Sequence, residues 1–279
     1  MSILNVQTMA IITGASRGIG RAIAISLAKR VSANSCLYLT ADDEEGLKET
    51  ANIIKRNVSK TIRLTCIPAD LDDEKNLEKL GELVFDKGEP TSNFSHAIFI
   101  NNAASKGPIE KYTRQLGDIE LIKKHYPLNL TTPVFLTSKF LQKFEKDNIR
   151  KTIINCTTPA SKDPQHTLHL YCMGKAGCDM FFRVVALEEP NLRVLLYDTG
   201  IVDTVMFRGL ENSAEASLRA KMKYLTEQSF FIKPEQSAEA LLKTLEDDNF
   251  ESGATVCCYD VMGINYDLSP VTQKTFSPH

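Results

Sequence analysis

The sequence predicts a single α/β domain of the doubly wound type, in which helices cover both faces of a seven-stranded parallel sheet. Short runs of β-branched and apolar residues alternate with longer amphipathic stretches, the pattern of strands joined by crossover helices. A glycine-rich turn directly follows the first of these runs. With 279 residues, 43% of them hydrophobic, the chain has the size of one large domain, and no linker divides it.

Seven short runs are the predicted strands, and the amphipathic stretches between them are the predicted helices. The strands cover residues 9–13, 36–40, 61–67, 96–101, 152–156, 193–197 and 255–259. The helices, each apolar at intervals of three and four, include 19–31, 44–56, 74–86, 170–188 and 237–247. This order predicts one Rossmann-type domain over residues 1–260.

Three segments depart from this alternation. Residues 116–147 have a helical pattern that Pro127 and Pro133 are expected to break or kink. Residues 203–234 carry no strand signal and follow the sixth strand, at the sheet edge where ligands bind, so they are a candidate substrate lid. Residues 261–279 are expected to be a weakly structured tail.

Composition excludes several classes of protein. The formal net charge is −2 and Lys and Arg form no basic block, which argues against a nucleic-acid partner. No apolar run approaches the roughly 18 residues of a membrane span, and no signal peptide is evident. The seven cysteines form no C-x-x-C pair, and His166 and His169 have no matching set of further ligands, so free thiols and no metal are expected. We therefore expect a cytoplasmic protein.

The segment Thr13-Gly14-Ala15-Ser16-Arg17-Gly18-Ile19-Gly20 joins the first strand to the first helix. Its backbone N–H groups and the helix N-terminus converge on one point, which suits a pyrophosphate. Gly14, Gly18 and Gly20 permit the tight turn and the close approach of a ligand. The segment predicts a dinucleotide site that includes Ser16, Arg17 and Ile19.

Residues after the next strands are expected to line the nucleoside part of that site. They are Ala41, Asp42, Asp70, Leu71, Asn102 and Ala103. An acid after the second strand favours a free ribose 2′-hydroxyl, whereas an Arg accommodates a 2′-phosphate. Asp42 therefore favours NAD(H) and Arg17 favours NADP(H), so both cofactors stay open.

Tyr171 is the only one of eight tyrosines with a lysine four residues later, Lys175, which places both on one helix face. An ammonium group beside a phenol lowers the phenol's pKa toward the range useful for proton transfer. Thr158, at the end of the fifth strand, could bind a substrate carbonyl, and the Asn129 amide could hold a water against Lys175. The alternatives are a surface i,i+4 pair for Tyr171 and Lys175, a capping or turn hydroxyl for Thr158, and for Asn129 an amide that satisfies the backbone at the helix kink.

Together these motifs resemble the short-chain dehydrogenase/reductase family. The motifs are Thr13-Gly14-x-x-x-Gly18-x-Gly20, Asn101-Asn102-Ala103, Asn129, Thr158 and Tyr171-x-x-x-Lys175. The resemblance implies that Tyr171 protonates a carbonyl, Lys175 lowers its pKa and binds the nicotinamide ribose, Thr158 orients the carbonyl and Asn129 supports a proton relay. It also implies cofactor contacts from Gly200, Val202 and Thr204, after the sixth strand.

Within the family, several segments resemble the sepiapterin reductases, above all Ala186-Leu187-Glu188-Glu189-Pro190-Asn191. This resemblance implies a homodimer that uses NADPH to reduce carbonyls on a pterin side chain in tetrahydrobiopterin synthesis, with Thr158, Tyr171, Gly200 and position 257 at the substrate. NADP(H) is accordingly favoured.

Four positions depart from that pattern. Thr158 replaces a Ser, Asp42 an Arg, Thr199 the Pro of a Pro-Gly pair, and Cys257 the Asp that grips the pterin ring. A thiol cannot replace a carboxylate that accepts charge-assisted hydrogen bonds, and Asp260 could do so only after a shift in register. The alternatives are a reductase of small dicarbonyls or quinones, and a dinucleotide-binding sensor without catalysis.

Overall fold

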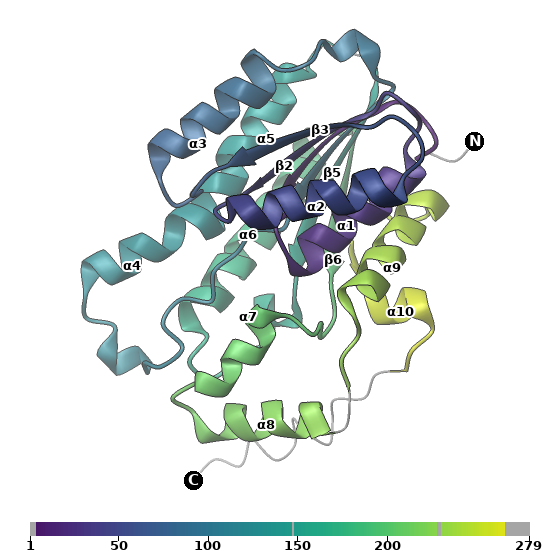
Figure 1. The fold of residues 1–279 in the computed structure, drawn as a ribbon. Helices are drawn as coiled ribbons and strands as arrows, with labels where there is room; N and C mark the ends of the chain where they lie inside the picture. Colours follow the sequence, from purple (N-terminus) through teal and green to yellow (C-terminus); the bar gives the residue numbers. More distant parts are fainter. Residues whose placement is uncertain (1–3, 147, 228–229, 266–279) are drawn as a thin grey trace.

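A seven-stranded parallel sheet forms the centre of the computed structural model, which describes residues 4–146, 148–227 and 230–265 (Figure 1). The strand order is β3-β2-β1-β4-β5-β6-β7, and each neighbouring pair is parallel. The strands are β1 (Thr8–Thr13), β2 (Cys36–Ala41), β3 (Arg63–Pro68), β4 (His96–Asn101), β5 (Arg150–Thr157), β6 (Leu192–Asp198) and β7 (Thr255–Cys257). The predicted doubly wound fold is confirmed.

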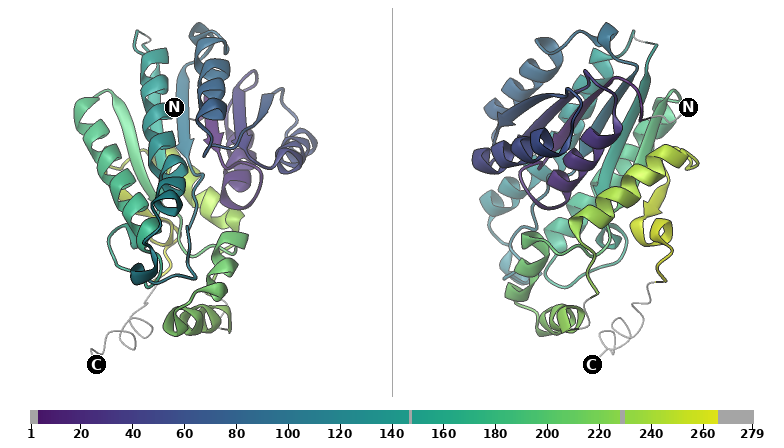
Figure 2. Two further views of the ribbon diagram at one scale, coloured as in Figure 1. Left: turned by 90° about the vertical axis from the view of Figure 1, so that its left-hand side faces the viewer. Right: turned by 45° about the vertical axis from the view of Figure 1, so that its right-hand side comes forward.

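Helices cover both faces of the sheet, as the views in Figure 2 show. One layer contains α1 (Gly18–Arg30), α2 (Glu44–Asn57) and α9 (Pro234–Asp247), and the other contains α3 (Glu74–Gly81), α5 (Thr132–Lys143) and α6 (His169–Glu188). An apolar core lies between the sheet and each helix layer, and successive strand residues alternate between these two cores. Tyr197 packs with the first layer and Leu196 with the second. Burial on both faces explains why the central strands are continuous apolar runs.

The predicted interruption at Pro127 is a π-helical turn, Pro127–Thr131, between α4 (Ile119–Tyr126) and α5. Side chains satisfy backbone groups around it. An Asp72 carboxylate oxygen accepts a hydrogen bond from the Leu128 N–H at 2.9 Å, and the Asn129 amide donates to the His125 carbonyl at 3.0 Å. The predicted helix over residues 74–86 likewise ends in a π turn, Glu82–Asp86.

The candidate lid forms α7 (Val205–Arg208), a 3₁₀ turn (Gly209–Asn212) and α8 (Ala216–Glu227), at one end of the sheet in Figure 1. A single parallel bridge between Val202 and Ile232 ties its two ends together. Leu218, Met222 and Leu225 of α8 form a separate apolar cluster with residues of the body. Sequence reasoning did not predict this bridge, although Ile232 follows Phe230 and Phe231.

The seventh strand is shorter than predicted, because Cys258 begins the helix α10 (Cys258–Met262) instead of extending the strand to 259. The Tyr259 hydroxyl accepts a hydrogen bond from the Ile201 N–H at 2.9 Å, which joins α10 to the segment after β6. The third strand likewise begins at Arg63 rather than at 61. Of the predicted tail, residues 266–279 lie outside the described part of the chain.

Candidate active site

The glycine-rich turn is a tight turn in which backbone atoms lie too close together for a side chain at Gly20. Gly14 and Gly18 have positive φ angles of 67° and 55°. A Cβ atom at Gly20 would lie 2.1 Å from the Gly14 carbonyl oxygen, so only glycine fits there. Helix α1 begins at this turn without a side-chain cap and without an acid in its first turn. Its N-terminal N–H groups and positive dipole end therefore suit an anionic phosphate, which is the fit that a bound dinucleotide requires.

Hydrogen bonds from the segments after β1, β3 and β4 reach the carboxyl ends of β1 and β2. The Ala15 N–H donates to the Thr40 carbonyl at 3.2 Å, and the Ala69 N–H donates to the Ala41 carbonyl at 2.9 Å. The Asn102 amide donates to the Thr13 carbonyl, also at 2.9 Å. These contacts place the predicted residues Ala41, Asp70, Leu71, Asn102 and Ala103 along one edge with the glycine turn.

Several predicted cofactor residues lie at or behind this edge. Ser16 is buried, and its carbonyl accepts a hydrogen bond from Arg21. Ile19 is half-buried in α1, and Val202 is buried at the base of the lid. A methyl group at Gly18 would lie 3.4 Å from the Thr204 side chain, so the segment after β6 returns to the glycine turn.

Arg17 and Asp42 are both exposed at the ribose end of the predicted site. Asp43, rather than Asp42, caps α2 by accepting a hydrogen bond from the Gly46 N–H at 2.8 Å. In the described residues, neither Arg17 nor Asp42 has a side-chain ion pair. Both charges are therefore available to a ligand.

Helix α6 holds Tyr171 and Lys175 against the end of β5. The Lys175 ammonium donates to the Cys156 carbonyl oxygen at 2.6 Å and lies 5.9 Å from the centre of the Tyr171 ring. Burial raises the pKa of Tyr171, and the positive charge of Lys175 opposes that rise. Lys175 is only 8% exposed, so the alternative of a surface pair is wrong.

Thr158 directly follows β5 and is half-buried at the start of a 3₁₀ turn, Pro159–Ser161. Its hydroxyl oxygen accepts from the Ala160 N–H at 3.4 Å, which leaves the hydroxyl proton available for a substrate carbonyl. The capping role considered from the sequence and the predicted substrate role are therefore compatible.

The side chain of Asn129 is already engaged. Its oxygen accepts from the Ser105 N–H at 3.1 Å, and its amide group donates to the His125 carbonyl. A methyl group at Gly174 of α6 would lie 3.1 Å from Asn129 Cβ, so the residue packs on the catalytic helix. The predicted water held by the Asn129 amide would have to share that group with His125.

Sequence reasoning missed Asp179, a buried carboxylate one helical turn after Lys175. It accepts hydrogen bonds from the Asn155 amide at 2.9 Å and the Thr157 hydroxyl at 2.8 Å. Asn155 in turn accepts from the Asn101 amide at 2.8 Å. An acid within the apolar pattern of residues 170–188 was the signal that could have revealed this network, which joins α6 to β5 and β4.

Cys257 and Gly200 lie at the carboxyl ends of β7 and β6, where the substrate is expected. A Cβ atom at Gly200, where φ is 74°, would lie 2.5 Å from Cys258 Sγ, so α10 packs directly on this loop. Asp260 is exposed on α10. Asp198, a second residue that sequence reasoning missed, is the register partner of Cys257.

The segment of residues 203–234 packs against helix α6. Tyr171 and Cys172 contact the apolar cluster that contains Leu218 and Met222 of α8. Polar contacts also join the lid to the body, including the Tyr112 hydroxyl to the Glu215 carboxylate at 2.8 Å. The role of residues 203–234 as a substrate lid stays a prediction.

His166 and His169 do not form part of a metal site in the described residues, where no three His, Cys, Asp or Glu side chains gather as ligands. The ring of His169 instead contacts the Lys111 carbonyl at 3.0 Å. All seven cysteines are free. No helix in the described ranges has the length and apolarity to cross a membrane.

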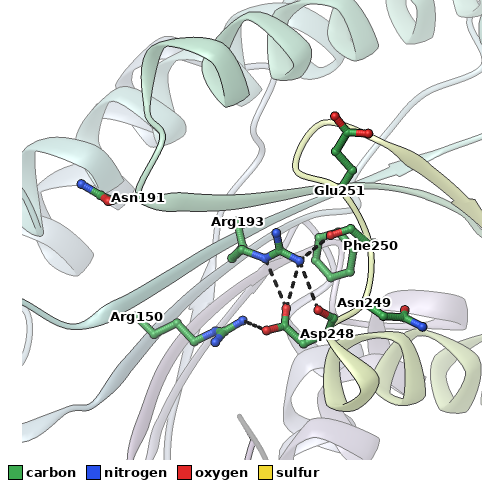
Figure 3. A pocket seen from close by; sticks show the side chains of 7 residues that line it. All are labelled: Arg150, Asn191, Arg193, Asp248, Asn249, Phe250 and Glu251. Carbon is green, nitrogen blue, oxygen red and sulfur yellow. Dashed lines mark hydrogen bonds and ion pairs between the residues drawn. The ribbon is translucent and has the colours of Figure 1, made fainter.

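A hollow lies at the opposite, amino end of β5 and β6 (Figure 3). Arg150 and Arg193 both pair there with Asp248, and the Arg193 guanidinium lies 4.2 Å from the centre of the Phe250 ring. The arginines are thus occupied in joining the two strands to the loop after α9. The reactive groups gather at the other end of the sheet.

Comparison with known proteins agrees with this arrangement. The family model described as short chain dehydrogenase matches residues 8–215. The chain belongs to the short-chain dehydrogenase family. As a member of this family it is an NAD(P)H-dependent oxidoreductase.

Similarity to individual members of the family extends over most of the chain. Sepiapterin reductase of Bos taurus is 35% identical over 256 residues, which cover 91% of this chain and 95% of the bovine protein. Benzil reductase ((S)-benzoin forming) of Bacillus subtilis is 28% identical and covers 85% of this chain and 92% of its own. The structure of L-sorbose reductase from Gluconobacter frateurii superposes with a TM-score of 0.74 at 21% identity, covering 92% of this chain and 97% of its own, and shows the same fold.

Proposed function

We propose that this protein is an NADPH-dependent carbonyl reductase that acts on the side-chain carbonyl of a pterin, in tetrahydrobiopterin synthesis. The observation that carries the proposal is the contact between buried Lys175 and Cys156 near the end of β5, which holds the ammonium beside Tyr171. The 35% identity to sepiapterin reductase of Bos taurus supports the pterin as substrate class.

Each of these side chains has one task in the proposed reduction. The nicotinamide, when bound, supplies the hydride. The Thr158 hydroxyl donates a hydrogen bond to the carbonyl oxygen, and Tyr171 gives that oxygen its proton. Lys175 stabilises the resulting phenolate, while the lid excludes water from the site. Asn129 positions α6 through its packing on Gly174 and supports proton supply to Lys175.

NADPH is the proposed cofactor because Arg17 is free to pair with a ribose 2′-phosphate at the N-terminus of α1. Asp42, which is also exposed, opposes that phosphate and permits some use of NADH.

The proposed assembly is a homodimer in the cytoplasm, formed through α5 and α6. Both helices expose large apolar residues, which single soluble chains rarely gather on one surface. These residues are Val134, Met173, Met180, Val184 and Leu187, the last 84% exposed. Light scattering after size-exclusion chromatography measures the mass directly, and a mass of one chain contradicts the dimer.

A second candidate is a reductase of small dicarbonyls with no role for a pterin. Cys257 removes the carboxylate expected there, and the Bacillus subtilis relative at 28% identity is a benzil reductase, whose substrate is a diketone. Such a substrate needs only the two hydroxyl groups and an apolar surface.

One assay separates the candidates. Purified protein is mixed with sepiapterin or with diacetyl, and oxidation of NADPH and of NADH is followed by absorbance. Sepiapterin turnover supports the proposal, and diacetyl turnover alone favours the second candidate. Cofactor binding without turnover of either compound indicates a dinucleotide sensor and contradicts both.

A further inference from the structure

Asp198 ends β6 at the carboxyl edge of the sheet, between the catalytic residues and β7. Its register partners are Thr157 of β5, which directly precedes Thr158, and Cys257 of β7. Register partners in a parallel sheet point to the same face. Asp198 follows the alternation of Val194 and Leu196, which face the α6 layer. Its charge is close enough to raise the pKa of Tyr171.

The carboxylate of Asp198 is only partly satisfied within the chain. One oxygen accepts a hydrogen bond from the Gly200 N–H at 3.0 Å. In the described residues no lysine or arginine forms an ion pair with it. Burial raises the pKa of Asp198 accordingly. The positive charge of Lys162 opposes that rise, although Lys162 forms no ion pair with Asp198. No oxygen of Asp198 is among the buried atoms that lack a partner, so the carboxylate is open to water or to a bound group beyond its contact with Gly200.

Other acids near the site have partners or are exposed. The Asp179 carboxylate receives bonds from Asn155 and Thr157. Asp203 is paired with Arg208 at 2.7 Å, and Asp260 is exposed to solvent. Of these four acids, only Asp198 is at least half-buried and has neither an ion pair nor hydrogen bonds from two side chains.

We propose that Asp198 is the substrate-recognising carboxylate of this enzyme, and that it binds a heterocycle presenting two adjacent N–H donors, as a 2-amino-4-oxopyrimidine ring does. The inference rests on the proposed function and specifies the substrate's binding group. Two N–H groups in the plane of a ring match the two oxygens of a carboxylate, which gives charge-assisted hydrogen bonds. The carboxylate absent at position 257 is thereby supplied from the adjacent strand, at the same register.

A matched pair of ligands tests this recognition. Pterin carries the 2-amino group, whereas lumazine has the same two fused rings with an oxygen in its place. Binding of each to the protein with NADP⁺ is measured by isothermal titration calorimetry, so the result does not depend on turnover. The wild-type protein is expected to bind pterin about tenfold or more tightly than lumazine, because lumazine turns an acceptor toward the carboxylate.

The ratio of these two affinities is then measured in variants. Asp198→Asn keeps an oxygen for the Gly200 N–H, and is expected to bring the ratio close to one. Asp260→Asn, the matched change of an exposed acid, is expected to leave it as in the wild type. Adding Cys257→Asp to Asp198→Asn is expected to restore the preference for pterin. Circular dichroism and NADP⁺ affinity verify that each variant is folded.

Three results overturn the proposal. They are equal binding of pterin and lumazine by the wild type, an unchanged ratio in Asp198→Asn, and loss of the ratio in Asp260→Asn instead. A different result would contradict the proposed function alone: pterin binds in preference to lumazine and this preference depends on Asp198, but sepiapterin is not reduced. Conversely, sepiapterin turnover with an unchanged ratio in Asp198→Asn retains the function and rejects Asp198 as the anchor.

Discussion

The Lys175 ammonium donates a hydrogen bond to the carbonyl oxygen of Cys156 at 2.6 Å, which joins helix α6 to strand β5. This bond uses one of three ammonium donors and keeps the charge 5.9 Å from the centre of the Tyr171 ring. A backbone acceptor within a strand cannot rotate away. The position of the charge that controls Tyr171 is therefore set by the sheet.

Replacing Tyr171 with Phe is expected to remove the proton donor while keeping the shape of the site. Turnover of the carbonyl substrate should fall by about 10²-fold or more, the usual contribution of general acid catalysis. Cofactor affinity, measured by fluorescence titration, should change little. Full activity in this variant would show that another group donates the proton.

Replacing Lys175 with Met is expected to move the pH dependence of alcohol oxidation to higher pH. In that direction Tyr171 acts as a phenolate base, so the rate rises as pH increases through its pKa. The positive charge of Lys175 lowers that pKa against the effect of burial. Its removal raises the pKa, and the rising limb of the pH–rate profile shifts upward. Lys55→Met, at an exposed position on α2, is the control.

Replacing Gly20 with Ala is expected to weaken dinucleotide binding, because the new Cβ would lie 2.1 Å from the Gly14 carbonyl oxygen and displace the turn. A loss of about tenfold corresponds to roughly 1.4 kcal/mol. Gly117→Ala, where no atom lies within 4 Å of the new Cβ, should bind as the wild type does. Equal affinities in the two variants would contradict the assigned phosphate site.

Replacing Asp179 with Ala is expected to destabilise the fold. The Asn155 amide and the Thr157 hydroxyl would lose their buried acceptor. Leaving two buried donors unsatisfied costs about 2 kcal/mol or more of unfolding free energy, measured in urea. Asp260→Ala, at an exposed acid, should stay within about 0.5 kcal/mol of the wild type. A stable Asp179→Ala protein would mean that water replaces the carboxylate.

Opposite effects on cofactor choice are expected at Arg17 and Asp42. Arg17→Gln should lower kcat/KM for NADPH by about tenfold, because a charge-assisted contact with the 2′-phosphate is lost. Asp42→Asn should raise kcat/KM for NADPH, because an anion near the phosphate is removed. Neither change should alter kcat/KM for NADH to the same extent. The ratio of the two constants is the measurement, and a constant ratio would place the 2′-phosphate elsewhere.

Much of the fold and of the site could be predicted from the sequence, because those parts depend on local pattern. The alternation of buried strands and amphipathic helices predicts the seven strands and both helix layers. The positive φ angles at Gly14 and Gly18 follow from a turn that needs glycine. The spacing of Tyr171 and Lys175 places them on one face of α6 without any knowledge of tertiary contacts.

The remaining features depend on contacts between segments that are distant in the sequence, and a local sequence pattern does not predict such contacts. The burial of Lys175 follows from its contact with Cys156, 19 residues earlier in the chain. The strand β7 ends at Cys257, after which α10 begins and Tyr259 bonds to Ile201 of a distant segment. Asp198 shares a row with Thr157 and Cys257 only because β5, β6 and β7 are adjacent and in this register. The sequence by itself determined the reactive groups and the fold class, whereas only tertiary structure decided which carboxylate lies beside them, since pairing between strands is set by packing across the whole sheet.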